Sequence, residues 1–149
     1  MENKMITGKC FCREIQYKVE ANILKSGICH CRDCQRLTGG MDWPFIVIPQ
    51  ESLVIQGETK EFTRLGASGK PVHVSFCGTC GSTLFGRPEI WPHIRIVGAS
   101  SLDDKTLFTP DMYVWTEEAP KWTLFDPNIP KFITAFTTYF GIFVFCYFG

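Results

Sequence analysis

Seven of the eight cysteines of this chain fall into three short clusters, and this grouping constrains the fold more than any other feature. The clusters are Cys10-Phe-Cys12, Cys29-His-Cys31-Arg-Asp-Cys34 and Cys77-Gly-Thr-Cys80. A closed structural zinc site takes four protein ligands, whereas a reactive zinc site has three and keeps one position open. Seven clustered thiols therefore predict two zinc sites of different kinds. A disulfide redox pair and an iron–sulfur cluster are the alternatives for such motifs.

Spacing alone leaves open which cysteines share a metal, because the third cluster can close a site with the first cluster or with two members of the second. Three cysteines close together in one loop can hold one ion by themselves, while two separated pairs form a natural four-ligand site. Geometry therefore favours a structural zinc held by the first and third clusters, at Cys10, Cys12, Cys77 and Cys80. The remaining three cysteines would hold a reactive zinc: Cys29, Cys31 and Cys34.

The composition indicates one domain in a reducing compartment. A chain of 149 residues is long enough for a single core, and a small domain gains much stability from a metal site. The 15 acidic and 15 basic residues cancel, so the basic surface expected of a nucleic-acid-binding protein is missing. The first residues contain no apolar segment of signal-peptide length, which predicts a cytoplasmic protein with reduced thiols.

Alternating apolar and polar residues predict a mostly β fold. Ile15, Tyr17 and Val19 alternate with polar residues, and Val72, Val74 and Phe76 repeat the pattern. Further expected strands are bounded by turn residues: 45–48, 52–55, 60–63, 94–97 and 112–115. Helical periodicity is scarce, and only the residues after Cys34 and residues 103–107 offer a turn or two. Asp103 and Asp104 are expected to cap the second of these.

The pattern also predicts where the thiols point. If the first strand runs unbroken through Cys10 and Cys12, both sulfurs lie on the face opposite to Ile15 and its apolar partners. By the same alternation, Cys77 points away from Val72 and Val74. We therefore expect the strands to display these thiols rather than to pack them in the core.

The charge of a three-cysteine site favours sulfur chemistry. Zinc with three thiolates carries a net negative charge and is a weaker Lewis acid than zinc held by neutral imidazoles, so activation of water is disfavoured. Such a soft site suits a fourth sulfur ligand, and a thiol bound to a metal is deprotonated. The expected task is to bind a small thiol whose sulfur adds to a carbonyl carbon, or releases one in the reverse direction.

The clusters and their flanking residues resemble the glutathione-dependent formaldehyde-activating enzyme family. The resemblance includes Gly8 before the first cluster, Thr38-Gly39 after the second and Phe76 and Gly81 around the third, and it spans roughly residues 8–125. It implies an Mss4-like β fold stapled by a structural zinc on the first and third clusters, with Cys29, Cys31 and Cys34 on a catalytic zinc. One departure is Arg13, which follows Cys12 where the family often has glycine and could alter the mouth of a loop.

The resemblance implies a carbon–sulfur lyase activity, in which formaldehyde and glutathione condense to S-hydroxymethylglutathione. The true thiol and carbonyl are left open, and a rival interpretation is a non-catalytic zinc module that carries thiols or binds a protein partner. Glutathione has two carboxylates, so Arg32 and Arg36 beside the three-cysteine cluster are candidate docking residues. His30 could act as a base, although an extended segment would point it away from Cys29 and Cys31.

The last residues differ from the rest of the chain. Residues 1–131 are expected to form the zinc-binding domain, whereas the apolar and uncharged tail of residues 132–149 lies outside the resemblance and contains Cys146. Three interpretations of the tail stay open: an atypical terminus, an apolar element that covers the core or pairs subunits, and a membrane anchor. Membrane contact is the least favoured, because only Lys121 and Lys131 provide flanking positive charge.

Overall fold

A computed structural model of the chain describes residues 4–134, and its fold is mostly β, as the sequence predicts. The short helix α1 spans Arg32–Thr38, and four single turns of 3₁₀ helix, η1 to η4, span Gln50–Ser52, Ala99–Ser101, Lys105–Leu107 and Thr116–Glu118. The strands are β1 (Met5–Lys9), β2 (Gln16–Glu20), β3 (Lys25–Cys29), β4 (Trp43–Pro49), β5 (Leu53–Gln56), β6 (Thr59–Leu65), β7 (Pro71–Cys77), β8 (Thr83–Pro88), β9 (Ile94–Gly98) and β10 (Tyr113–Val114).

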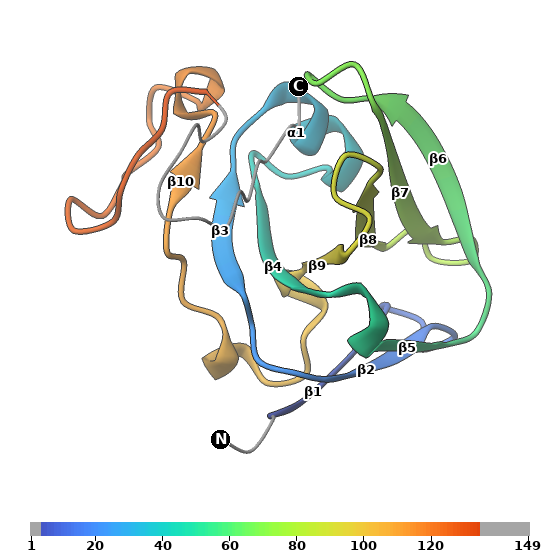
Figure 1. Cartoon of the computed structure of the whole chain (residues 1–149). Helices are drawn as coiled ribbons and strands as arrows, with labels where there is room; N and C mark the ends of the chain where they lie inside the picture. Colours follow the sequence, from blue (N-terminus) through green and yellow to red (C-terminus); the bar gives the residue numbers. More distant parts are fainter. Residues whose placement is uncertain (1–3, 135–149) are drawn as a thin grey trace.

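Within residues 4–134 the strands form a small sheet and a large one. The three-stranded sheet has the order β1-β2-β5, and the seven-stranded sheet has the order β10-β3-β4-β9-β8-β7-β6. Figure 1 shows the small sheet at the base of the molecule, below the large sheet. All pairings are antiparallel except that of β10 with β3. Because β1 and β7 belong to different sheets, the first and third cysteine clusters start from different sheets.

The expectation of an unbroken first strand through Cys10 and Cys12 is wrong. Strand β1 ends at Lys9, and the chain turns back on itself before β2 begins at Gln16. The Cys10 amide donates to the Ile15 carbonyl at 3.0 Å, and the Arg13 amide donates to the Cys10 carbonyl at 3.2 Å. Arg13 has a positive φ of 70°, which reverses the chain direction. The first cluster therefore lies on a turn, and strand alternation does not apply to it.

The cysteines of all three sequence clusters pack within two groups of buried hydrophobic residues. Cys10 packs in the same hydrophobic group as Ile15, Tyr17 and Val19. Strand alternation had predicted that it would lie on the opposite face. Cys77 lies in this same hydrophobic group, whereas Val72 and Val74 belong to the second group. Cys77 therefore points away from these two valines, as alternation predicts. Cys10 is 3% exposed and Cys77 is 1% exposed. The expectation that the strands display these thiols outside the core is therefore wrong.

Gly8 lies where the two sheets meet, at a point too crowded for any side chain. It pairs with Tyr17 across the small sheet and forms an isolated bridge to Leu102, which follows the large sheet. A Cβ atom at this position would overlap the Tyr17 hydroxyl and would lie 2.6 Å from the Ser101 carbonyl oxygen. The Tyr17 hydroxyl is held in place by Ser101 Oγ at 2.6 Å.

We expect Gly8→Ala to lower the free energy of unfolding by about 2 kcal/mol, because the added methyl group forces these crowded groups apart. Urea unfolding measures the effect. Gly40→Ala is the control, since its Cβ would find its nearest neighbour, the Asp42 carbonyl oxygen, at an ordinary 3.4 Å. The control should change the stability by less than about 0.5 kcal/mol. Equal stability of Gly8→Ala and the parent would contradict the crowding argument.

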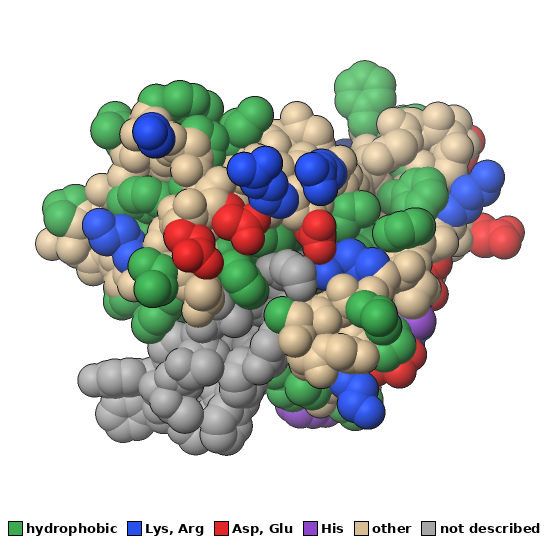
Figure 2. Space-filling view, turned by 90° about the horizontal axis from the view of Figure 1, so that it is seen from above, with side chains coloured by type: hydrophobic (Ala, Val, Ile, Leu, Met, Phe, Trp, Pro, Cys, Tyr) green, Lys and Arg blue, Asp and Glu red, His purple; other side chains and the backbone are tan. Residues whose placement is uncertain are grey.

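The outer surface carries mixed side chains on the face that is visible from the top of Figure 1. Figure 2 shows basic, acidic and apolar groups next to one another on this face. No helix within residues 4–134 has both the length and the apolar character needed to cross a membrane. Residues 135–149 lie outside the described residues, so the interpretations of the apolar tail stay predictions.

Candidate metal centres

The first centre joins the turn after β1 to the knuckle after β7. The Sγ atoms of Cys10 and Cys12 are 3.5 Å apart, and those of Cys12 and Cys77 are 3.6 Å apart. All four sulfurs of the first and third clusters lie within 4.8 Å of one another. Four thiolates around one zinc, with bonds of about 2.3 Å, would hold their sulfurs about 3.8 Å apart. The donor set and its spacing therefore fit a tetrahedral metal ion such as zinc.

Polar groups contact two of the sulfurs of this centre. The Ile15 amide donates to Cys10 Sγ at 3.3 Å. Ser82 Oγ lies 3.1 Å from Cys80 Sγ, and this hydroxyl is the main reason why the pKa of Cys80 falls to about 5. A thiolate is the form in which cysteine binds metals. Thr79 Oγ1 donates to Glu14 Oε2 at 2.6 Å, which fastens the knuckle to the turn that carries Cys10 and Cys12.

The second centre is formed by the end of β3 and the start of α1. Cys29 is the last residue of β3, Cys31 caps the N-terminus of α1, and Cys34 lies in its first turn. The Cys34 amide donates to Cys31 Sγ at 3.3 Å, so this sulfur also stabilises the helix. The three sulfurs lie within 4.8 Å of one another. The structure thus gathers the cysteines of the second cluster around one point and separates them from the other four.

A cation fits the electrostatics of this second centre. Cys29, Cys31 and Cys34 are all 0% exposed. Burial and the neighbouring sulfurs raise the pKa of the Cys34 thiol well above its ordinary value. Three buried thiols this close together cannot all ionise unless a positive charge balances them. A divalent metal would supply that charge, and the three sulfurs would leave one position of a four-coordinate ion for another ligand.

Comparison with protein families identifies the chain. The family model described as glutathione-dependent formaldehyde-activating enzyme matches residues 5–118. The chain belongs to this family. No curated protein matches it. A crystal structure of a Rhodobacter sphaeroides protein is similar to it, with a TM-score of 0.53 and 17% identity over 84% of this chain and 98% of that chain. At that identity the likeness shows a shared fold.

In this member of the formaldehyde-activating family, His30 lies between two cysteines of the second centre. Its side chain packs against aromatic rings, with the Phe125 ring centroid 5.1 Å away and the Tyr113 ring centroid 6.1 Å away. Burial lowers the pKa of the imidazole, so the neutral form is favoured. His30 is not among the residues whose ligand atoms gather with the three sulfurs. The role of His30 as a base stays untested.

The other two histidines of the described residues belong to neither centre. His73, on β7, places Nε2 2.7 Å from Glu89 Oε1 and Nδ1 3.1 Å from Glu61 Oε1. His93 is exposed at the surface. Neither one belongs to the groups of residues that could hold a metal ion.

The two arginines predicted to dock glutathione lie on α1, close to the second centre in the sequence. Both Arg32 and Arg36 are exposed. The Arg32 amide donates to Glu118 Oε2 at 2.5 Å, which joins the start of the helix to η4. Neither side chain lines the groove described below. Their role in ligand binding stays a prediction.

A surface groove of about 820 Å³ borders the first centre and reaches residues that neighbour the second centre. Cys10 lines it on the side of the first centre, and Thr38 and Trp43 line it on the side of the second. Thr38 Oγ1 donates to the Cys34 carbonyl at 2.8 Å, and Trp43 lies opposite Cys29 in the pairing of β3 with β4. The volume falls within the range of about 300–1,000 Å³ that is typical of small-molecule sites. Sequence reasoning missed the groove, because its walls come from four separate segments of the chain.

Arg13 is the unusual residue of this groove. It lines the groove with φ at 70°, a left-handed conformation that costs a residue with a side chain about 1 kcal/mol relative to glycine. The glycine that the family resemblance leads one to expect here would adopt this conformation without strain. In this chain an arginine occupies a backbone position suited to glycine and faces the groove beside the metal centres.

Proposed function

We propose that the chain is a metal-dependent carbon–sulfur lyase that forms or cleaves an adduct between a glutathione-type thiol and formaldehyde or a similar small carbonyl. The observation that carries the proposal is the unequal division of the sulfurs, with four around one point and three around another. Four thiolates saturate a zinc ion, whereas three leave room for a substrate. The family match supports the choice of glutathione and formaldehyde.

In this proposal Cys10, Cys12, Cys77 and Cys80 hold a structural zinc, and Cys29, Cys31 and Cys34 hold a catalytic one. Zinc at the second centre would supply a fourth coordination position and would lower the pKa of a thiol held there. In the forward reaction the sulfur of the thiol forms a bond to the carbonyl carbon, and the proton released by the thiol ends on the carbonyl oxygen. The reverse reaction breaks that bond and returns the proton to sulfur.

The residues of the chain position these partners and exclude water. Burial of the three cysteines keeps solvent from their sulfurs, and the amide that donates to Cys31 Sγ fixes its orientation. Thr38 and Trp43 line the groove, and they also neighbour Cys34 and Cys29 respectively. We place the substrate thiol in the groove and the reaction in the cytoplasm, where glutathione-type thiols are reduced.

A second function is favoured by one observation. Because Cys29, Cys31 and Cys34 are completely buried, their metal could be purely structural, in a module that stores thiols or binds a protein partner. The two functions differ in whether an external thiol reaches the second centre.

We expect the zinc-loaded protein at micromolar concentration to accelerate the exchange between formaldehyde and S-hydroxymethylglutathione by at least about tenfold over the spontaneous rate. Exchange spectroscopy by nuclear magnetic resonance measures this rate at equilibrium, without a coupled enzyme. The control is zinc chloride at twice the protein concentration. Acceleration no greater than that of the free salt would leave the storage or partner-binding module as the function.

A further inference from the structure

The guanidinium group of Arg13 is available to a ligand. Arg13 lines the groove, and its side chain forms no hydrogen bond or ion pair with any residue in the range 4–134. The turn is held instead by main-chain groups, since the Arg13 amide donates to the Cys10 carbonyl and the Arg13 carbonyl accepts from Gln16 Nε2 at 3.3 Å. The side chain of Arg13 thus contributes nothing visible to the fold, although its backbone conformation is an unfavourable one.

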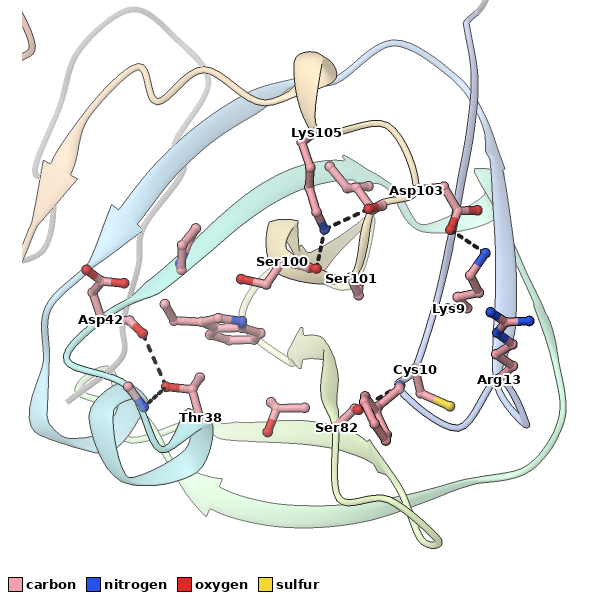
Figure 3. A pocket seen from close by; sticks show the side chains of 16 residues that line it. Lys9, Cys10, Arg13, Thr38, Asp42, Ser82, Ser100, Ser101, Asp103 and Lys105 are labelled. Carbon is pink, nitrogen blue, oxygen red and sulfur yellow. Dashed lines mark hydrogen bonds and ion pairs between the residues drawn. The ribbon is translucent and has the colours of Figure 1, made fainter.

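Lys105 supplies a second positive charge to the same groove. Its ammonium donates to the Leu102 carbonyl at 2.7 Å and to the Ser100 carbonyl. Figure 3 shows both contacts, with the ammonium held at the wall of the groove. Both acceptors are uncharged and leave one of its three N–H donors free, while the nearby Asp103 carboxylate attracts the charge of Lys105. Lys105 is therefore oriented in advance toward an anionic group.

The groove also contains one ion pair and one further carboxyl group. The ammonium of Lys9 is paired with Asp103 Oδ1 at 2.9 Å, so these two charges cancel. Asp42 also lines the groove, and Figure 3 shows it on the side opposite to Arg13. The groove thus presents Arg13 and Lys105 on different walls and one carboxyl group opposite to Arg13. Glutathione carries two carboxylates and one ammonium at neutral pH, which is the complementary set of charges.

We propose that Arg13 forms a carboxylate-binding subsite that anchors a carboxylate of the substrate thiol in this groove, with Lys105 and Asp42 as the further charged groups on its other walls. This inference rests on the proposed function for the identity of the thiol. It assigns the recognition to a residue that departs from the glycine common in the family. Arg13 binds and positions the substrate, and it takes no part in the bond that forms at sulfur.

The test uses Arg13→Gly in the zinc-loaded protein and S-methylglutathione as the ligand, because a methylated sulfur binds without forming an adduct. Calorimetry should show that the variant binds S-methylglutathione about tenfold more weakly than the parent, since a charge-assisted contact is lost. The variant should also melt about 3 °C higher, because glycine relieves the left-handed conformation. Structural damage cannot produce weaker binding together with higher stability.

Two controls isolate the charge. The diethyl ester of S-methylglutathione has no carboxylates, so the parent and Arg13→Gly should bind it equally. Lys121→Ala removes one positive charge from an exposed residue outside the groove and should leave the affinity for S-methylglutathione unchanged. The subsite is refuted if the parent does not bind S-methylglutathione at 10 mM, or if Arg13→Gly binds it as tightly as the parent. Failure of the proposed function would show instead as normal binding of this ligand with no acceleration of exchange.

Discussion

Cys77→Ser is expected to prevent stable folding of the whole domain. The variant should lose one of two bound zinc ions, and its near-ultraviolet circular dichroism should resemble that of the unfolded chain. The reason is that the four-cysteine centre joins the turn after β1, in the small sheet, to the end of β7, in the large sheet. Replacing one thiolate removes a ligand and leaves the other sulfurs uncompensated in the core.

The size of this effect follows from the energy of the metal site. A structural zinc contributes on the order of 10 kcal/mol to folding at neutral pH. A domain of this size has a total stability of about 5–15 kcal/mol. Losing most of the free energy that zinc binding contributes would therefore remove most or all of the free energy of unfolding. Cys77 is also 1% exposed, so a serine hydroxyl at this position would be buried.

Thr79→Ala is the matched control, because it changes the same knuckle without removing a ligand. It deletes only the hydrogen bond to Glu14 and should cost about 1 kcal/mol while the protein keeps both zinc ions. Metal analysis and chemical unfolding measure these two outcomes. A Cys77→Ser protein with native dichroism and two zinc ions would show that the four cysteines are not a structural metal site.

Cys31→Ser is expected to have the opposite profile, with a folded protein that has lost its activity. It should bind one zinc ion rather than two, and its acceleration of the formaldehyde–glutathione exchange should fall by at least about 100-fold. Serine supports folding here because its oxygen can accept the same hydrogen bond from the Cys34 amide that the sulfur accepts at the start of α1. Serine is nonetheless a poor substitute for a thiolate on zinc.

Cys31→Ala separates the two roles of this sulfur. Alanine removes both the metal ligand and the helix cap, so Cys31→Ala should match Cys31→Ser in zinc content and activity but should be about 1 kcal/mol less stable. Metal analysis, exchange rates and urea unfolding of the two variants provide the comparison. Full activity in Cys31→Ser would exclude the three-cysteine centre as the reacting site, and an unfolded Cys31→Ser would show that this centre is structural.

Several elements of the fold could be predicted because their local pattern is strong. The alternation in residues 72–76 predicts β7, and the apolar segment 45–48 predicts the core of β4. Strands β3 and β8 were missed, because Gly27 and Gly86 interrupt their apolar patterns. Gly27 is required by packing, since a Cβ atom there would lie 2.8 Å from the ring of Phe45. A constraint imposed by a partner strand cannot be seen in local periodicity.

The two metal centres also differ in how far the sequence alone could predict them. Cys29, Cys31 and Cys34 lie within six residues, so their meeting around one point follows from the sequence alone. Joining the first cluster to the third requires β1 and β7 to be brought together, which spacing left as one of two options. The turn at Cys10–Ile15 was missed because Arg13 adopts a conformation that its residue type rarely adopts.

The sequence by itself determined the number and type of metal-binding groups, the mostly β class and the family, because these depend on residue identity and short spacing. Only the tertiary structure decided that the thiols are buried, that one centre links the two sheets, and that Arg13, Lys105 and Asp42 line one groove. These three residues come from different segments of the chain. Their proximity is produced by the pairing and packing of distant strands, which local sequence patterns do not encode.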